Sequence, residues 1–284
     1  MRKRQQQVYS QRQLDRARKL AYEHSGISLA ANKDVMISNR LDKLKRLLGN
    51  ENIDEVLAIH ESGKNIDIFI SAFTTNKTNF FRESFHFEDL KDRVVKKAIE
   101  SSAGLKIYCS AASTGEEPYS ILMTIEEAKE QHANPLFNYS VIATDIDKEV
   151  LRHAQEGIYE FNKNANDFPL WIKPSQYFKR REHPNKHGEH LIKIKDILSR
   201  KIKFDQMNLM SPKYPFNANE FDVVFCRNVL IYFNQDDQNA ILKKLFGTLK
   251  VGGTLYLGHS ESPLGLSPYV ERCGQNIFIK TKEF

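Results

Sequence analysis

Residues 107–120, IYCSAASTGEEPYS, decide the fold. An apolar strand from Ile107 to Cys109 runs into small residues, a glycine and the start of a helix. Nucleotide-cofactor folds cradle a pyrophosphate at such a loop, using several glycines and the positive end of a helix. Here one glycine is present, and Glu116 and Glu117 stand where the phosphate would lie. Because these carboxylates would repel a phosphate, the loop favours a cationic or polyhydroxyl ligand.

The same glutamates also have a purely structural interpretation. Pro118 suits the first turn of a helix, where its missing N–H costs nothing, and it predicts a helix start there. The glutamates would then lie at the positive end of that helix and stabilise it by about 0.3–1 kcal/mol each.

A second acidic residue follows the next predicted strand. The run YSVIATD ends in Asp145, where a carboxylate can accept hydrogen bonds from ribose hydroxyls. Together the two loops predict a nucleoside-binding fold that needs no phosphate and tolerates positive charge. S-adenosylmethionine fits, because it carries a ribose, an ammonium and a sulfonium that carboxylates and aromatic faces attract.

From about residue 105 onward, short apolar runs alternate with segments of helical pattern. This alternation predicts a parallel sheet covered on both faces. The expected strands are LKIYCSA, YSVIATD, FDVVFCR and TLYLGHS, and the expected helices start at Pro118, Lys148 and Asp236. GGTLYLG and NIFIKT predict a terminal antiparallel hairpin. HLIKIK and RKIKFDQ alternate apolar and charged residues, which predicts a small antiparallel β-insert at roughly residues 176–205.

The first 75 residues or so have helical patterns throughout. SQRQLDRARKLAYEHSGI predicts a helix with Ser10 as its N-cap and DVMISNRLDKLKRLLG predicts another that stops at Gly49. IDEVLAIHESG and NIDIFISAFT predict shorter helices, although a buried strand also fits the second run. The apolar spacing places these residues in the core: Leu14, Ala17, Leu20 and Ala21 of the first helix, and Val35, Leu41, Leu44 and Leu48 of the next.

Composition limits the cellular setting and the partner. The 284 residues contain no apolar run approaching the roughly 20 residues that cross a bilayer, and the basic N-terminus lacks the apolar region of a secretory signal. The chain has three cysteines, Cys109, Cys226 and Cys273, which fit neither a disulfide framework nor a zinc spacing. We therefore expect the protein to reside in a reducing cytoplasm. The net charge of +6 favours an acidic partner, and nucleic acid, an anionic membrane and an acidic protein all qualify.

Taken together, stretches in this order resemble the CheR-type chemotaxis receptor methyltransferases: TTNKTNFFRESFHF, CSAASTGEEPYS, ATDIDKEVLRHAQEGIY, FDVVFCRNVLIYF and GGTLYLGHSES. Enzymes of this family move a methyl group from S-adenosylmethionine to glutamate side chains of chemoreceptors and release S-adenosylhomocysteine. The resemblance implies a Rossmann-like class I methyltransferase domain of the α/β class with a small antiparallel β-insert. It further implies an all-α domain at 1–75, an interdomain segment contributing to the cofactor site at 76–92, and the methyltransferase domain at 93–284.

The resemblance also implies roles for individual residues. Arg82 and Tyr232 match catalytic positions, and no metal is expected. The positions implied to bind the cofactor are Asn76, Thr78, Arg82, Glu117, Asp145, Asn208, Leu209, Cys226 and Arg227. Each has an alternative interpretation: Arg82 as an interdomain ion-pair residue, Tyr232 as core, Asn208 as a turn residue and Cys226 as a buried filler.

A receptor glutamate, with a reference pKa near 4.3, is already ionised at pH 7, so the expected displacement at the cofactor methyl needs no general base. Arg82 can orient the carboxylate through forked hydrogen bonds, and the Tyr232 hydroxyl can fix one oxygen.

Chemoreceptor methylation regions are helical and acidic, and the basic helix NRLDKLKRLLG presents Arg40, Lys43 and Arg46 as candidate receptor contacts. A solvated charged face is the alternative. The resemblance implies a cytoplasmic protein that associates with membrane receptor arrays without entering the membrane, and we expect a monomer. Family members that bind a receptor C-terminal peptide tend to have a compact glycine-rich turn in the insert. REHPNKHGEHL departs from that pattern, so we expect no dependence on such a peptide.

Other functions are less well supported. His183, His187 and His190 lie close in sequence, but no carboxylate or cysteine completes a convincing metal site. GHSES at residues 258–262 lacks the final glycine of a nucleophile elbow. An RNA methyltransferase would suit the basic charge, but the aromatic and basic interleaving typical of single-strand binding is missing. A non-catalytic module that binds S-adenosylmethionine is disfavoured by the presence of Arg82 and Tyr232.

Overall fold

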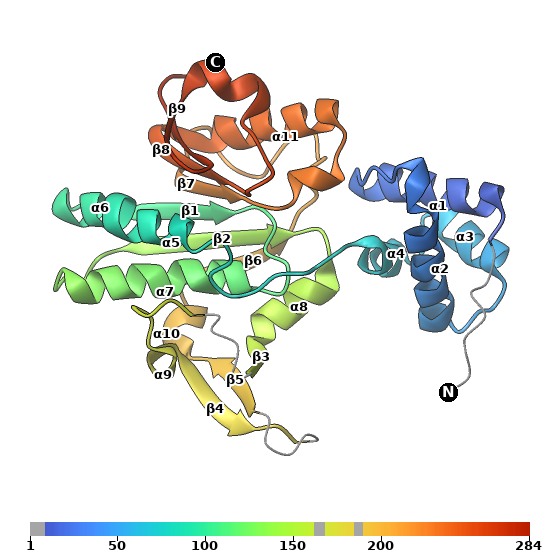
Figure 1. Cartoon of the computed structure of the whole chain (residues 1–284), viewed down its shortest axis with the longest axis horizontal. Coiled ribbons are helices and arrows are strands. Elements are labelled where there is room, and N and C mark those ends of the chain that lie inside the picture. Colours follow the sequence, from blue (N-terminus) through green and yellow to red (C-terminus); the bar gives the residue numbers. More distant parts are fainter. Residues whose placement is uncertain (1–8, 162–167, 185–189) are drawn as a thin grey trace.

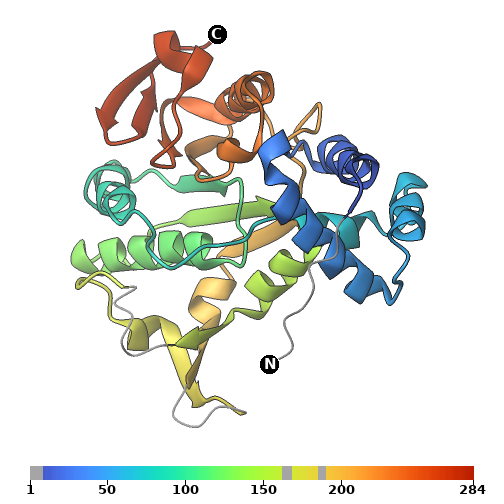
Figure 2. The same cartoon turned by 45° about the vertical axis from the view of Figure 1, so that its right-hand side comes forward.

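The computed structural model describes residues 9–161, 168–184 and 190–284, and Figure 1 shows its architecture. A mixed sheet with helices on both faces occupies the centre, with a bundle of helices on one side and a small sheet below. Figure 2 shows from a second direction that the bundle lies beside the sheet domain.

The bundle consists of α1 (Gln11–Ser25), α2 (Asp34–Leu48), α3 (Ile53–Glu61) and α4 (Ile66–Phe73), with the short turn η1 (Ala31–Lys33) before α2. The Ser10 side chain accepts from the Gln13 N–H and the Gln13 side chain accepts from the Ser10 N–H, a capping box that starts α1 as predicted. The run NIDIFISAFT forms a helix, which removes the strand alternative.

Of the eight residues predicted to form the core of the bundle, six are buried, Leu48 is partly buried against them and Val35 is exposed. Leu14, Ala17, Leu20 and Ala21 are buried together with Leu41 and Leu44. Val35 was predicted to be core, but its side chain is 64% exposed and Ile37 is buried in its place. The helix starts at Asp34 and turns Ile37 inward with Leu41 and Leu44, a spacing of four and three residues that leaves Val35 on the outer face.

In the described residues, the larger sheet has seven strands in the order β6-β2-β1-β7-β8-β10-β9. Neighbours from β6 to β8 are parallel, and β10 runs antiparallel to both β8 and β9. This is the order of the Rossmann-like class I methyltransferase fold that the sequence implied. The strands are β1 (Leu105–Cys109), β2 (Tyr139–Asp145), β6 (Ile202–Gln206), β7 (Phe221–Cys226), β8 (Leu249–Leu257), β9 (Val270–Gly274) and β10 (Ile277–Lys280).

Alternate residues of the strands fill two separate cores. Ile107 and Phe225 point to the face covered by α7 (Glu116–Gln131) and by a helical stretch at residues 85–100. Tyr108 and Val224 point to the opposite face, which α11 (Gln235–Thr248) covers. The stretch at 85–100 joins α5 (Phe85–Asp89), the π-helical turn η2 (Leu90–Val95) and α6 (Lys96–Glu100).

The helix after β1 begins earlier than predicted. Gly115, with φ of 100°, is the N-cap of α7, so the helix starts at Glu116 and both glutamates occupy its first turn. The other predicted starts are close, because α8 spans Lys148–Glu156 and α11 begins one residue before Asp236.

The assignment of RKIKFDQ to the β-insert was wrong. Its residues form β6, which pairs parallel with β2 at the edge of the main sheet. The small sheet instead has the order β3-β5-β4, with β3 (Ile158–Phe161), β4 (Phe178–Glu182) and β5 (His190–Ile194). An alternating pattern marks a half-exposed strand but not its direction, and an edge strand of a parallel sheet is also half exposed. Short helices α9 (Pro174–Tyr177) and α10 (Asp196–Ser199) flank this sheet.

The C-terminal strands were predicted in part. GGTLYLG and NIFIKT form the antiparallel neighbours β8 and β10, but the hairpin partner of β10 is β9, which was not predicted. The turns η3 (Leu230–Tyr232) and η4 (Leu264–Tyr269) precede α11 and β9. The three cysteines are free thiols. In the described parts of the chain, the helices are too short or too polar to cross a membrane.

Candidate active site

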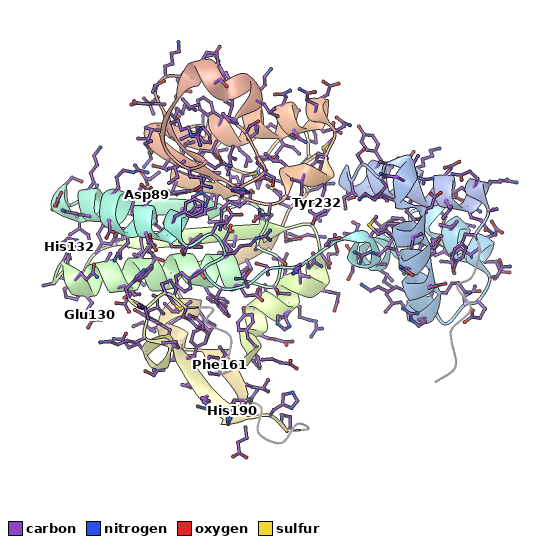
Figure 3. The ribbon with its side chains drawn as sticks, viewed as in Figure 1. Asp89, Glu130, His132, Phe161, His190 and Tyr232 are labelled. Carbon is purple, nitrogen blue, oxygen red and sulfur yellow. The ribbon has the colours of Figure 1, made fainter. Side chains whose placement is uncertain are left out.

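A pocket of about 290 Å³ opens at the carboxyl ends of β1, β2 and β7, facing the helical bundle. The predicted site residues that line it are Asn76, Thr78, Arg82, Glu117, Asp145, Arg227 and Tyr232. Tyr232 lies on the side of the sheet domain that faces the bundle (Figure 3). The carboxyl ends of parallel strands are the usual ligand-binding edge of an open α/β sheet.

The other predicted cofactor residues lie around the pocket without lining it. Asn208 donates from Nδ2 to the His24 carbonyl at 3.0 Å, and its Oδ1 accepts from the Met210 N–H at 2.8 Å. Leu209 is buried in the core beneath α11. The Cys226 side chain is fully buried, and burial raises the pKa of its thiol, in agreement with a filler role.

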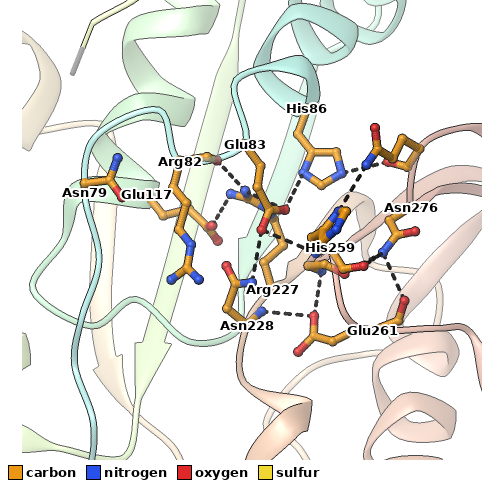
Figure 4. A network of polar contacts seen from close by, with 12 residues as sticks. Asn79, Arg82, Glu83, His86, Glu117, Arg227, Asn228, His259, Glu261 and Asn276 are labelled. Carbon is orange, nitrogen blue, oxygen red and sulfur yellow. Dashed lines mark hydrogen bonds and ion pairs between the residues drawn. The ribbon is translucent and has the colours of Figure 1, made fainter. Parts of the chain in front are cut away.

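A buried ion cluster forms the floor of the pocket (Figure 4). The Arg227 side chain is 0% exposed, contacts Glu117 Oε2 through Nη1 and lies 3.2 Å from Glu83 Oε2 through Nη2. Cys109 Sγ donates to Glu117 Oε1 at 3.3 Å, and the Phe87 ring lies 5.5 Å from the guanidinium carbon. Strand β1 supplies the thiol, the first turn of α7 supplies Glu117 and the end of β7 supplies Arg227.

The charges of this cluster favour a cationic ligand. Burial raises the pKa of Glu117, although Arg227 lowers it in part. Burial would also raise the pKa of Glu83, but Arg227, Asn228 and the His259 N–H together hold it below its usual range. Two carboxylates therefore share one guanidinium, and an ammonium or sulfonium placed beside Glu117 would offset the excess negative charge. The side chains present thus fit S-adenosylmethionine.

Asp145 is held rigidly at the end of β2. Its carboxylate accepts from the Ser113 N–H at 2.8 Å and from the Asp147 N–H at 3.0 Å. Burial raises the pKa of Asp145, and these backbone donors oppose that effect. Each carboxylate oxygen has a second lone pair, so the side chain can still accept ribose hydroxyls.

Asp147 anchors the segment before the pocket, a role that the sequence analysis missed. Its Oδ2 accepts from Thr74 Oγ1 at 2.8 Å and from Asn76 Nδ2 at 3.1 Å, and its Oδ1 caps α8 through the Glu149 N–H. The sequence signal for Asp147 is its position at the N-cap of a predicted helix. Its hydrogen bond with Thr74 could not be predicted, because the two residues are 73 positions apart.

The helical bundle contributes the outer wall. Ser25 and Ile27, at the end of α1, line the pocket, and the Ser28 N–H donates to the Tyr232 carbonyl at 2.8 Å. Gly26 has φ of 76°, and a Cβ there would overlap the Met210 and Phe233 side chains. The end of α1 and the residues after it therefore pack directly against Met210, Tyr232 and Phe233.

Arg82 and Tyr232 both line this pocket. Among the described residues, Arg82 has no ion pair, and its Nη1 donates only to the Lys77 carbonyl at 3.2 Å, so the ion-pair alternative is not supported. Tyr232 is partly buried, and it both lines the pocket and packs against the core beneath α11.

The basic residues of α2 divide into different environments. Arg40 donates to Thr75 Oγ1 at 2.9 Å and Lys43 donates to the Ser71 carbonyl at 2.8 Å, and burial lowers the pKa of both. Arg46 is exposed. Arg46 is therefore free to face solvent or a partner, whereas Arg40 and Lys43 are already hydrogen-bonded to the chain.

Of the three histidines considered as metal ligands, two lie in the described residues. His183 Nε2 lies 3.7 Å from Glu160 Oε1, His190 begins β5, and His187 is outside the described residues. Within the described ranges, no group of three or more His, Cys, Asp or Glu side chains could hold a metal ion.

Known proteins resemble this chain over most of its length. The family profile "CheR methyltransferase, SAM binding domain" matches residues 76–278. The chain is 36% identical to the chemotaxis protein methyltransferase of Klebsiella aerogenes over 94% of its own length and 89% of that protein. It is 34% identical to that of Borreliella burgdorferi (89% of each chain) and 36% identical to that of Escherichia coli (94% and 90%). The chain belongs to the CheR family of S-adenosylmethionine-dependent methyltransferases.

Proposed function

We propose that this protein methylates glutamate side chains of chemoreceptors and so takes part in chemotactic adaptation. The observation that carries the proposal is one pocket with an excess of buried carboxylate on its floor and the guanidinium of Arg82 and phenol of Tyr232 at its mouth. The floor suits a cationic methyl donor and the mouth suits an anionic acceptor. The names and identity of the curated relatives give independent support.

The chain's own residues then have distinct tasks. S-adenosylmethionine supplies an electrophilic methyl group, which a carboxylate oxygen takes while S-adenosylhomocysteine is left. Arg82 can hold the incoming carboxylate in a fork, and Tyr232 can donate to one of its oxygens. Ser25 and Ile27 of the bundle close the outer wall, which would help hold the reacting groups together.

A methyl-transfer assay tests the proposal. The protein is incubated with methyl-labelled S-adenosylmethionine and receptor-containing membranes, and the product is treated with mild alkali. We expect label on the receptor and its release as volatile methanol, because methyl esters hydrolyse under these conditions. Alkali-stable label on nucleic acid would instead indicate an RNA substrate, and cofactor binding without any transfer would indicate a non-catalytic module.

The receptor is proposed to approach over α2. Because Arg46 is exposed whereas Arg40 and Lys43 are bound to the chain, Arg46→Glu is the cleanest charge reversal. We expect it to raise the KM for receptor by about threefold to tenfold, since each exposed contact contributes about 0.2–1 kcal/mol and reversal adds repulsion. The dissociation constant for S-adenosylhomocysteine should not change.

Lys97→Glu is the matched control, because Lys97 is also exposed but lies on α6, at the end of the sheet away from the bundle (Figure 1). An equal rise in KM for both variants would contradict a specific role for α2. We further propose that the protein works as a monomer in the cytoplasm at receptor arrays, without binding nucleic acid. The turn used to predict independence from a receptor C-terminal peptide includes residues 185–189, which are outside the described residues, and that independence stays a prediction.

A further inference from the structure

Asn228 lies between buried carboxylates from distant parts of the chain (Figure 4). Its side-chain Nδ2 donates to Glu83 Oε1 at 3.1 Å, and its backbone N–H donates to Glu261 Oε2 at 3.0 Å. Glu83 follows Arg82 in the segment before α5, and Glu261 follows β8. Asn228, the second residue after β7, thus joins the segment before α5 to the segment after β8.

Glu261 fixes the backbone that leads to Tyr232. Its Oε1 accepts from the N–H groups of Val229 and Leu230, each at 2.8 Å, and Leu230 starts the turn η3 that ends at Tyr232. Its Oε2 also accepts from the Gly258 N–H at 2.6 Å. Burial raises the pKa of Glu261, and these backbone donors oppose that rise.

The strand end behind Glu261 is itself held in place. Asn276 Nδ2 donates to the carbonyls of Gly258 at 2.5 Å, His259 at 3.1 Å and Glu261 at 3.0 Å. The stretch GHSES, compared above with a nucleophile elbow, therefore supplies a rigid carboxylate acceptor.

Glu83 performs the corresponding task for Arg82. It pairs with Arg227 Nη2, and the same nitrogen donates to the Arg82 carbonyl. The His259 N–H adds a contact to Glu83 Oε1 at 3.3 Å. His86 lies beside this pair with Nδ1 at 3.6 Å from Glu83, and burial lowers its pKa to about 4, so it is neutral at pH 7.

The backbone at these positions is strained. Phe81, Glu83 and Asn228 have φ of 53°, 58° and 57°, and Ser113 on the pocket wall has φ of 48°. Non-glycine residues other than Asn and Asp cost about 1–2 kcal/mol each in this region, and such strain persists only where the surroundings enforce it. At Glu83 the contacts with Arg227, Asn228 and the His259 N–H supply that enforcement.

We propose that Glu83 and Glu261 are positioning residues for methyl transfer. Glu261 sets the turn that presents Tyr232, and Glu83 sets the backbone from which Arg82 extends. Asn228 connects them, so the groups that contact the substrate are aligned by one continuous buried network. The proposal rests on the proposed function, because it assigns these glutamates to the step in which Arg82 and Tyr232 hold the acceptor.

Glu261→Gln tests the first half of the network. Glutamine retains one acceptor oxygen, so one pair of N–H donors would face an NH2 group and the turn would shift. We expect kcat for receptor methylation to fall about 10²-fold, since a misplacement of about 1 Å can have that effect. KM for the cofactor should stay within about threefold, because Glu261 does not line the pocket.

A double-mutant cycle separates positioning from a general structural role. In a Tyr232→Phe background, Glu261→Gln should lower kcat by less than about threefold, because the group it positions is already missing. The same cycle applies to Glu83→Gln in an Arg82→Ala background. Additive losses in both cycles would overturn the proposal, as would wild-type kcat in both single variants.

Controls keep the result interpretable. Glu271→Gln removes an exposed carboxylate on β9 and should leave kcat unchanged. If Glu261→Gln does not fold, as judged by circular dichroism, Glu261→Asp replaces it with the same expectation, because the shorter side chain keeps the charge but withdraws the acceptor. Wild-type protein that methylates no receptor would refute the proposed function, whereas active wild type with additive cycles would refute only this inference.

Discussion

Arg82→Ala is expected to lower kcat for receptor methylation by about 10²- to 10³-fold. Arg82 lines the pocket mouth and, among the described residues, has no ion pair, so its guanidinium is available to fork onto an incoming carboxylate. Removing it would leave the acceptor unoriented and its charge unopposed in a partly water-excluded site, and a lost preorganised donor has effects of this order. Single-turnover transfer of a labelled methyl group measures the step directly.

Arg82→Lys is the informative companion, because lysine keeps the charge and loses the planar fork. We expect it to recover less than a tenth of the lost rate. Calorimetry with S-adenosylhomocysteine shows whether binding is spared in both variants. Unchanged turnover and unchanged cofactor affinity in Arg82→Ala would show that Arg82 has no role in this site.

Glu117→Gln is expected to weaken S-adenosylmethionine binding by about 10- to 100-fold. The buried carboxylate lines the pocket and shares Arg227 with Glu83, so its negative charge is only partly offset in the protein alone. Removing one charge of a buried pair between a ligand and its site costs about 2–5 kcal/mol of binding energy, and the Arg227–Glu83 pair that remains places the effect at the lower end. Calorimetric titration of wild type and Glu117→Gln with the cofactor measures the loss of affinity.

Glu116→Gln is the matched control. The neighbouring Glu116 accepts from Thr114 Oγ1 at 2.6 Å and does not line the pocket. We expect less than a threefold change in affinity for this variant. Equal losses in Glu116→Gln and Glu117→Gln would contradict the assignment of Glu117 to the cofactor.

The pH dependence of binding should follow the same residue. Burial raises the pKa of Glu117, so protonation removes the charge at a higher pH than for an exposed glutamate. Cofactor affinity should therefore fall as the pH is lowered through that raised pKa, and Glu117→Gln should flatten this part of the profile. An unaltered profile in the variant would assign the titration to another group.

Folding should respond in the opposite sense. A carboxyl with a raised folded-state pKa favours folding below its unfolded pKa, near 4.3, and this contribution is lost as the pH rises through the folded-state value. At neutral pH the ionised side chain thus destabilises the protein without ligand. Glu117→Gln should consequently melt at a temperature no lower than wild type while binding the cofactor more weakly.

The order of strands and helices was largely readable from local pattern. Apolar runs spaced by helices predicted the parallel sheet, and the Ser10 cap and periodic leucines predicted the bundle. The error in strand assignment came where a pattern fits more than one partner. RKIKFDQ alternates as any half-exposed strand does, and only its pairing with β2 shows that it belongs to the main sheet.

The sequence by itself indicated the chemistry of the ligand, because two glutamates in the loop after β1 disfavour phosphate and Asp145 after β2 suits ribose hydroxyls. Their meeting at one sheet edge follows from the parallel order of the strands. Only the tertiary structure decided how the groups are held. Asp147 binds Thr74, which is 73 residues away, Glu83 binds Asn228, which is 145 residues away, and Glu261 binds Leu230, which is 31 residues away. Local periodicity in a sequence cannot predict such contacts. A buried carboxylate is stable only with its donors in place, and the folded chain alone brings those donors together.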